Sequence, residues 1–494
     1  MFIHEYKWNK KDFMSLKKSC SDILDLNEIQ LYQPYFSLYI HVHNTKFSHK
    51  ILDLKRRYYI KKICSYNNEK FYTSNLLTSC IVYDSKNNIH EQKEAFCKCI
   101  PLLDPIHLLM NNYCNNIHRN TLLPSLYNYN TYNKINSMDN TAYIDTFFSF
   151  ICSNITLEEL NPSFPIYYGS VNGIKKEFNY DISEDYYEFK KEKWFYKNCG
   201  KTYTLDMYLS DTESENSFHS SNSSHSSNSS HSSNSSHSSN SSHSSNSSDS
   251  GDYIACLKEI PCQNLFIEKL DGTLEDFLED SNNVNIDLII SCIFQISFAL
   301  FYLQKNYQFT HNDLHINNIM YIKTNRIFLY YKFNNIYFKV PTYGYLFKII
   351  DFGRSIFTFH KKQFFNDTFD KHGEAEGQYT FPINNLLFNK DNKDKIYPNF
   401  NFDLCRLAIT ILDVLDYNKN KNYNENKYFY DFIYSLTKDI NDQSLFEQED
   451  DFYMYINIAK YANNSLPIFV IQNELFNKYR IKKNKFPKKS YYSI

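Results

Sequence analysis

Residues 311–318 read HNDLHINN, and residues 347–353 read FKIIDFG. The first stretch follows a long apolar run from Ile286 to Leu303, which is typical of a buried helix, and the second ends a strand-like run. Asp313 precedes Asn318 by five residues, and Asp351 follows the strand. Phosphoryl transfer needs one carboxylate that orients the attacking hydroxyl. It also needs an amide and a second carboxylate that hold Mg²⁺ on the phosphates. Asp313, Asn318 and Asp351 therefore supply the kinds of group that a site for this reaction would use.

The two stretches together resemble the catalytic loop H-x-D-x-x-x-x-N and the metal-binding D-F-G of the protein-kinase superfamily. The resemblance implies an α+β, bilobal fold with a small β-rich N-lobe and a helical C-lobe. It implies ATP as the phosphoryl donor, Mg²⁺ or Mn²⁺ as the cofactor and a protein as the acceptor. The resemblance implies that Asp313, His315 and Lys98 are catalytic and that Asn318 and Asp351 bind metal and nucleotide.

Further positions follow from the same resemblance. Residues 96–100, FCKCI, look like the third N-lobe strand, whose Lys98 would contact the ATP phosphates. A helix predicted over 140–155 carries Asp145, which would pair with Lys98, although the family prefers Glu there. The strand that ends at Ile267 and Glu268 looks like the fifth strand, and Glu268 to Leu270 like the hinge under adenine. Asp403 matches the helix residue that braces the catalytic loop.

Four departures separate this chain from the family pattern. No glycine precedes Gly169, so the glycine-rich phosphate loop is missing, and a tight turn at residues 65–68 is the expected substitute. Asn312 stands where the family has Arg, and His315 stands where it has Lys. Asp313 and Asp351 are 38 positions apart, the stretch between them contains an aromatic-rich insertion, and no A-P-E motif follows. The strings CKCIPLLDP, THNDLHINNIMY, KIIDFGRSIF and NFDLCRLA, with an AT-rich codon bias, resemble the divergent kinase-like proteins of giant DNA viruses of the Mimivirus-like type; an AT-rich protist is the alternative source.

Low-complexity sequence interrupts the N-lobe. The hexad HSSNSS repeats from His219 to Ser248, and Ser and Asn offer nothing to bury, so a disordered linker is expected. A strand is expected from the alternation in residues 36–42, FSLYIHV. The expected organisation is an N-terminal extension (1–45), an N-lobe (46–267) with an insertion (172–258) that holds the disordered tract (about 211–251), a C-lobe (268–475) and a basic tail (476–494).

Composition limits the remaining function classes. The net charge is -2 and 42% of the 494 residues are hydrophobic, which excludes a histone-like polycation and a wholly disordered chain. Twelve cysteines without a CxxC pair favour reduced thiols. No signal peptide or membrane span is expected, so an intracellular location, in host cytoplasm or virion, follows. The stretch from Lys478 to Lys489 contains six Lys, one Arg and no acid, which favours a solvated, frayed tail, with a nucleic-acid or nuclear-import patch as the alternative.

Three activities stay open at this point. A Ser/Thr protein kinase is the leading hypothesis, because all three chemistry-bearing polar residues remain. A pseudokinase scaffold is favoured by the missing glycine loop. A small-molecule phosphotransferase of the aminoglycoside-kinase type is favoured by the D-L-H-x-x-N loop and the absent A-P-E. The substrate, the activator and the oligomeric state do not follow from the sequence.

Overall fold

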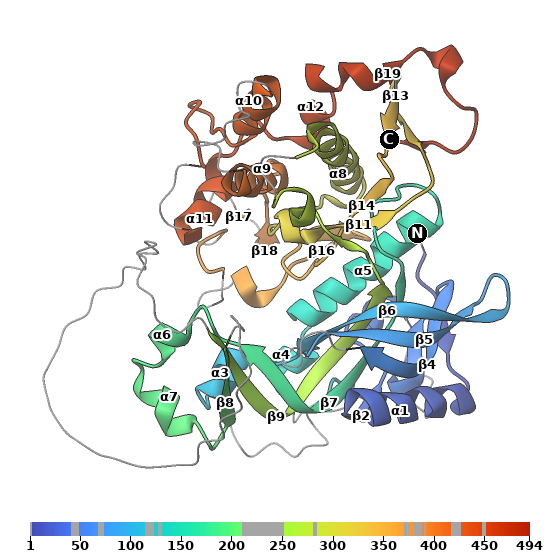
Figure 1. Ribbon diagram of the computed structural model, residues 1–494. Helices are drawn as coiled ribbons and strands as arrows, with labels where there is room; N and C mark the ends of the chain where they lie inside the picture. The colour runs from blue at the N-terminus through green and yellow to red at the C-terminus, as the bar shows by residue number, and fades with distance from the viewer. Residues whose placement is uncertain are drawn as a thin grey trace, which may run out of the picture.

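The computed structural model describes residues 2–40, 49–67, 74–113, 123–126, 131–209, 251–279, 284–369, 373, 375–379, 388–389, 392–415, 426–446 and 451–494. Within these residues a strand-rich part is followed by a helix-rich part, so the fold is α+β with two lobes (Figure 1). The repetitive tract expected to be disordered, about 211–251, lies almost wholly outside the described residues.

One antiparallel sheet organises the N-lobe. Its strand order is β2-β7-β9-β6-β5-β4, with β8 paired to β9. Every second side chain of β5 is buried. Successive side chains of a strand point to opposite faces, so one face of β5 lies in the core. The strands are β2 (Leu26–Gln30), β4 (Tyr58–Asn67), β5 (Leu76–Asp84), β6 (Ile89–Pro101), β7 (Tyr167–Asp181), β8 (Tyr203–Leu209) and β9 (Gly251–Glu268).

Helix α5 (Thr141–Leu157) connects this sheet to the C-lobe. Asn140 caps its N-terminus by accepting a hydrogen bond from the Ala142 amide. Nearly every side chain along the helix is buried, because one side packs on the N-lobe and the other meets the helix-rich part (Figure 1). The expected helix over 140–155 is therefore present, and it holds Asp145 between the two lobes.

The N-terminal segment is built into the N-lobe. Helix α1 (Lys10–Leu24) packs on β4 through Leu16 and Cys20, and β1 (Glu5–Lys7) pairs with β3 (Leu52–Leu54). The strand predicted over 36–42 is wrong in its first half, where α2 (Phe36–Tyr39) forms instead. The physical reason is tertiary packing, because Tyr35 stacks on Phe147 of α5 at 4.5 Å between ring centroids.

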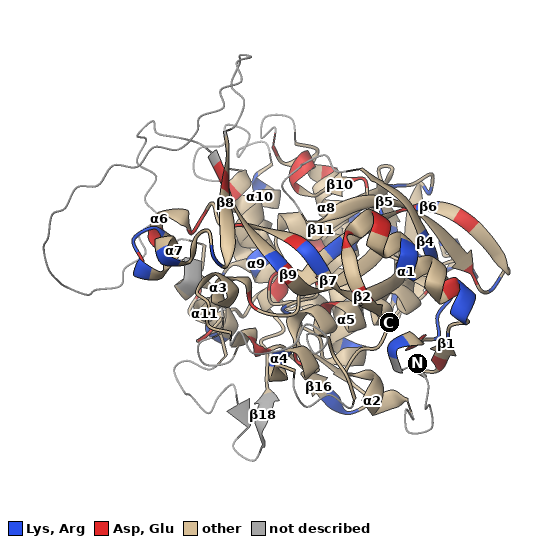
Figure 2. Ribbon diagram, turned by 90° about the horizontal axis from the view of Figure 1, so that it is seen from below, with Lys and Arg blue, Asp and Glu red and all other residues tan. Residues whose placement is uncertain are grey.

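Part of the expected insertion at 172–258 is regular structure. Strand β7 runs on to Asp181 and pairs with β9 along most of its length. Two short helices, α6 (Tyr186–Phe189) and α7 (Lys193–Asn198), follow and lead into β8. Figure 2 shows Lys and Arg interspersed with Asp and Glu over the N-lobe elements, so no single sign of charge dominates that view.

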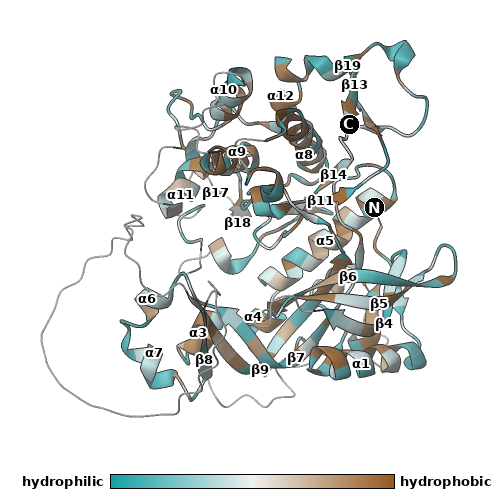
Figure 3. Cartoon of the chain, viewed as in Figure 1, coloured by the Kyte–Doolittle hydropathy of each residue, from teal (hydrophilic) through white to brown (hydrophobic). Residues whose placement is uncertain are grey.

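The C-lobe is centred on the buried helix α8 (Ile286–Tyr307) (Figure 3). Among the described helices only α8 is long and apolar enough to cross a membrane, and 83% of its apolar window is buried inside the protein. The other described helices of this lobe are α9 (Phe402–Val414), α10 (Lys427–Leu436), α11 (Asp451–Tyr461) and α12 (Pro467–Val470).

The aromatic-rich insertion and the chain's C-terminus form one sheet. Strands β12 (Phe328–Phe333) and β13 (Ile336–Pro341) make a hairpin beside α8. The end of the chain adds β19 (Arg480–Ile481) to β13 and β20 (Tyr492–Ser493) to β12. The stretch from Lys478 to Lys489 is mostly solvated as expected, but the expectation that it is frayed is wrong, because β19 and β20 pair with the hairpin and Tyr492 is buried.

Candidate active site

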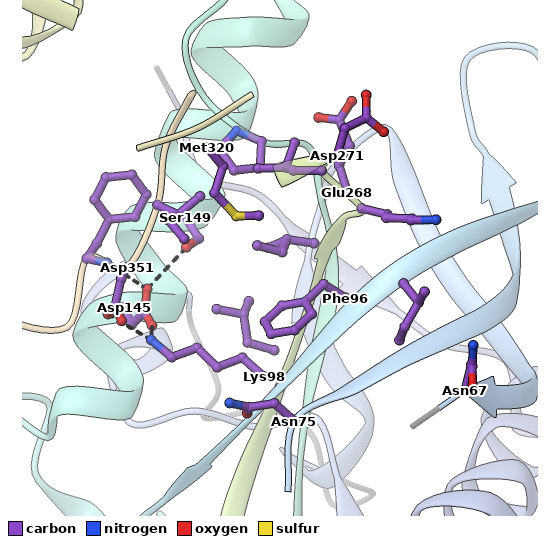
Figure 4. A pocket seen from close by; sticks show the side chains of 18 residues that line it. Asn67, Asn75, Phe96, Lys98, Asp145, Ser149, Glu268, Asp271, Met320 and Asp351 are labelled. Atoms are coloured by element: carbon purple, nitrogen blue, oxygen red, sulfur yellow. Dashed lines mark hydrogen bonds and ion pairs between the residues drawn. The ribbon is translucent and has the colours of Figure 1, made fainter. Parts of the chain in front are cut away.

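Lys98 joins two carboxylates at the boundary between the lobes. Its Nζ lies 2.7 Å from Oδ2 of Asp145 and 2.7 Å from Oδ1 of Asp351 (Figure 4). The three residues come from β6, from α5 and from the segment after β14 (Tyr345–Ile349). Burial alone would lower the pKa of Lys98, but the two carboxylates outweigh it and raise that pKa above its ordinary value. The ammonium therefore stays charged and links the two lobes.

Asp351 is held in a left-handed conformation, with φ of 61°. The next amide, that of Phe352, donates a hydrogen bond of 3.0 Å to Oδ1 of Asp145. The Phe352 ring packs on Phe148 of α5 at 5.1 Å and on His311 at 5.8 Å. These contacts offset the strain of the positive φ at Asp351. The Asp351 side chain lines the pocket and is 41% exposed.

The loop at 311–318 holds its polar groups by internal hydrogen bonds. Asn318 Nδ2 donates to the Asp313 carbonyl at 2.8 Å and lies 2.9 Å from Nε2 of His315. The Ile350 amide donates to the Asn318 carbonyl at 3.1 Å, and this bond brings Asn318 beside the segment that carries Asp351. Burial lowers the pKa of His315, so the imidazole is neutral at physiological pH.

Asp403 at the start of α9 braces the same loop from beneath. Its carboxylate accepts hydrogen bonds of 2.9–3.0 Å from the backbone amides of His311 and Asn312. The His311 Nε2 is in turn 2.8 Å from the Ile350 carbonyl. Burial raises the pKa of Asp403 to about 6, although these amides favour the charged form. The predicted bracing contact is present.

A pocket of about 520 Å³ opens beside Lys98. The residues predicted for the hinge, Ile267, Glu268 and Leu270, all line it. The Glu268 carboxylate is engaged by Lys348 Nζ at 2.8 Å and by the Ile166 amide at 3.1 Å, so it stiffens the strand end. The other lining residues are Asn67, Asn75, Leu77, Phe96, Lys98, Asp145, Ser149, Pro165, Leu265, Lys269, Asp271, Met320, Ile350, Asp351 and Phe352.

The expected tight turn at 65–68 is wrong for its described part. Ser65, Tyr66 and Asn67 belong to β4 and pair in register with β5, while position 68 lies outside the described residues. Ser65 pairs with Ser79 and Asn67 pairs with Leu77. This strand pairing gives the backbone of β4 hydrogen-bond partners on β5, which a turn at these positions would remove. Asn67 and Asn75 border the pocket on this side.

Asn318 and Asp351 offer oxygen donors that suit a divalent cation. Because Nδ2 of Asn318 bonds to the Asp313 carbonyl, Oδ1 is the atom left to coordinate. Mg²⁺ is bound in proteins by one or two such oxygens together with substrate phosphates and water. Among the described residues no group of three or more His, Cys, Asp or Glu could hold a metal alone. The residues present therefore fit a cation that arrives with a phosphate ligand.

Two residues of the candidate site, one beside Asp313 and one in the pocket, were not predicted from the sequence. Tyr455 of α11 donates a hydrogen bond of 2.7 Å to Oδ1 of Asp313 across 142 sequence positions, and no local pattern signals such a contact. Phe96 points into the pocket two residues before Lys98 (Figure 4). The period of two along a strand places Phe96 and Lys98 on one face, and this signal was available in the sequence.

Comparison with known proteins gives partial matches. No family model matches the chain. The chain is 27% identical over 199 residues to the uncharacterized protein 098R of Invertebrate iridescent virus 6, a match that covers 36% of this chain and 33% of that protein. It is 31% identical over 134 residues to the serine/threonine-protein kinase haspin homolog of Drosophila melanogaster, covering 26% of this chain and 23% of that protein. The chain thus spans about a third of the length of the viral protein and about a quarter of the length of the fly protein. In the part that matches the fly protein, it is similar to a protein kinase.

Proposed function

We propose that this chain is an ATP-dependent protein kinase that transfers the γ-phosphoryl group to a serine or threonine hydroxyl. The observation that carries the proposal is the double ion pair of Lys98 with Asp145 and Asp351 at the edge of a nucleotide-sized pocket. The Asp145 carboxylate is buried and the Lys98 ammonium is part-buried, so this charge cluster carries a desolvation cost that function explains better than packing. The partial similarity to the Drosophila haspin homolog agrees with protein hydroxyls as acceptors.

Each residue has a role in this proposal. Adenine occupies the pocket between Phe96 and Met320, against the strand end at Ile267 to Leu270. Lys98 neutralises the α- and β-phosphates, and Asp145 keeps its ammonium aimed at them. Asp313 accepts a hydrogen bond from the attacking hydroxyl and takes its proton as the bond to phosphorus forms. Asp403 keeps the loop backbone in place while this happens.

Asn318 and Asp351 would hold Mg²⁺, or Mn²⁺, which when bound neutralises charge on the β- and γ-phosphates. Asp351 would exchange part of its contact with Lys98 for the cation, while Asp145 remains as the partner of Lys98. His315 positions Asn318 through the 2.9 Å contact between their side-chain nitrogens.

The test is transfer of labelled phosphate from ATP by the purified full chain. We expect protein phosphorylation that requires a divalent cation. Asp313→Asn should reduce the rate by about 10²–10⁴-fold and leave nucleotide binding nearly intact, because the carboxylate faces the hydroxyl. Asp351→Ala should abolish the effect of Mg²⁺ on ATP-induced thermal stabilisation, because it removes a metal ligand. Asp413→Asn, an exposed site on α9, is the matched control. Full activity in Asp313→Asn would refute the proposal.

The same assay separates the alternatives. A pseudokinase scaffold is supported by the absence of any glycine before Gly169, since side chains hinder a close approach of backbone amides to phosphate. It predicts no transfer and no cation-dependent nucleotide binding. A small-molecule phosphotransferase predicts transfer to an aminoglycoside such as kanamycin and none to protein.

A further inference from the structure

The C-terminal segment closes a groove on the outer face of the β12–β13 hairpin. Ile481 pairs with Tyr337 and Ser493 with Lys332, so the chain enters and leaves at opposite edges of the hairpin. Between these points Phe486 packs on Tyr337, with 4.9 Å between ring centroids. Figure 1 shows the C-terminus beside β13 and β19, far from the N-lobe sheet. The groove measures about 600 Å³ and is separate from the nucleotide pocket.

The two segments that form this groove are rich in lysine and contain no acidic side chain. Neither 314–350 nor 475–494 contains an Asp or Glu. Lys332, Lys483 and Lys488 line the groove, and none of the three forms an ion pair with a described residue. Nearby lysines on the same segment are also exposed; they are Lys482, Lys485 and Lys489. Uncompensated lysines this close together attract a polyanion.

Aromatic rings alternate with these lysines in the groove wall. Tyr337, Phe486 and Tyr491 line it, and Tyr491 lies 5.0 Å from Phe486 between centroids. The outward positions of β12 and β13 carry both rings and lysines, and Lys339 Nζ stands 3.8 Å over the Phe328 ring. Phe486 packs on both Tyr337 and Tyr491, and these mutual contacts fix the rings in place. Fixed aromatic rings are surfaces on which a planar group can stack.

We propose that this groove binds single-stranded nucleic acid, with phosphates on the lysines and a base on Tyr491. The combination of a positive groove and aromatic platforms is what sequence-tolerant strand binding requires. An acidic protein would pair with the lysines but would bring no bases to stack on Tyr337, Phe486 and Tyr491, which also line the groove. Duplex DNA keeps its bases stacked inside and would not reach the rings. The site is independent of phosphoryl transfer and extends beyond the kinase proposal.

The experiment measures binding of a fluorescent oligothymidylate of about 20 nucleotides to the full chain by anisotropy, without ATP. We expect affinity to fall as salt rises. Lys332→Ala/Lys483→Ala/Lys488→Ala should weaken binding by about tenfold or more. It should also reduce the slope of log K against log salt concentration by about 2, because each of the three lost phosphate contacts contributes about 0.7 on a single strand. The matched control is Lys10→Ala/Lys11→Ala/Lys18→Ala on α1, which removes the same charge from another face and should bind like the wild type. Unchanged melting temperatures check that all variants fold.

Tyr491→Leu tests the stacking contact while keeping an apolar side chain against Phe486. We expect it to weaken oligonucleotide binding about fivefold or more and to leave binding of a poly-glutamate peptide unchanged. Equal affinity for duplex and single strand, or equal losses in both triple-lysine variants, would overturn the proposal. Tighter binding of poly-glutamate, unaffected by Tyr491→Leu, would assign the groove to an acidic protein instead. Phosphoryl transfer by the groove variants should match the wild type, so this result and the kinase test can fail separately.

Discussion

The phenol of Tyr455 donates a hydrogen bond of 2.7 Å to Oδ1 of Asp313. Tyr455 comes from α11, late in the chain, whereas Asp313 belongs to the loop before β11 (Ile319–Lys323). Arg354 approaches the same oxygen, with Nη1 at 3.9 Å. A hydroxyl that donates to this carboxylate occupies the position that an acceptor substrate needs. Tyr455 is therefore expected to compete with the substrate hydroxyl.

Tyr455→Phe should raise kcat/KM for a protein substrate by up to about tenfold. The reason is that a hydrogen bond to a charged group contributes about 1.5–3 kcal/mol, part of which the substrate must replace. The measurement is the initial rate of phosphate transfer at low substrate. Tyr461→Phe, an exposed tyrosine on the same helix, should change nothing. A fall in kcat would show instead that Tyr455 holds Asp313 in position.

Phe96→Ala should weaken ATP binding and widen the pocket. Phe96 lines the pocket with Met320, and we expect adenine between them. Loss of the ring removes a stacking contact of about 1 kcal/mol, which corresponds to about fivefold in Kd. The space gained should let the variant accept an ATP analogue with a benzyl group on N6, which the wild type should refuse. Phe96→Leu is the control that keeps apolar volume and removes the stacking. Equal use of the analogue by wild type and Phe96→Ala would place the base elsewhere.

Asp403→Ala should lower the free energy of unfolding by about 2–4 kcal/mol, because the buried amides of His311 and Asn312 lose their acceptor. Urea denaturation followed by fluorescence measures this change. The matched control is Asp413→Ala, an exposed acid on the same helix, for which we expect a change below about 0.5 kcal/mol. Similar losses in both variants would contradict the bracing role.

Asp403 also predicts a pH dependence of stability. Its pKa is about 6 in the folded chain, above the ordinary value of 3.8 that applies when unfolded. Between these values the folded state binds the extra proton, so the contribution of this group to stability grows as pH falls through 6 and shrinks as pH rises. Asp403→Asn carries no titrating group. We expect the stability of the wild type relative to Asp403→Asn to increase from about pH 7.5 to about pH 5. A constant difference would show that the carboxylate does not titrate there.

Local patterns and sequence motifs predicted the centre of the site. The spacing of Asp313 and Asn318 and the strand before Asp351 are local features, and the family pattern then led to Lys98 and Asp145, whose ion pair is present. The helix period of 140–155 placed Asp145 correctly. The motif spacing and the helix period could be predicted because each depends on residues within one short segment. The ion pair joins two elements, and the family pattern was needed to predict it.

Contacts between distant segments could not be predicted in this way. The pairing of β12 with the C-terminus joins residues far apart in sequence, and a two-residue strand such as β20 has no periodicity to detect. Tyr455 is one of 44 tyrosines, and only the packing of α11 brings it to Asp313. The segment at 36–39 alternates like a strand, but burial of Phe36 and Tyr35 against α5 favours a helical turn. Tertiary packing decided these cases.

Asn312 predicts that activity does not depend on phosphorylation of the segment after Asp351. An arginine at this position would form a bidentate contact with a phosphate, which Asn cannot make. In the structure Asn312 Nδ2 donates to the Arg354 carbonyl at 3.0 Å, and Oδ1 accepts a hydrogen bond from the Tyr379 hydroxyl. The segment is therefore anchored on Asn312 by uncharged hydrogen bonds that need no modification.

The candidate phosphate acceptors in this segment fit the same conclusion. Tyr379 is only 1% exposed and Thr368 only 8%, so neither is accessible to a second kinase in this conformation. Thr358 remains as a part-exposed candidate, and a further hydroxyl residue of the segment, Thr380, lies outside the described residues. Phosphatase treatment of the purified chain should leave the transfer rate within about twofold, because no phosphate is needed to order the loop. Tyr379→Phe should lower the rate severalfold, since it removes the anchor while keeping the ring against Phe369. A loss of more than about tenfold after phosphatase, restored on rephosphorylation, would mean that Arg354 or another cation binds a phosphate here.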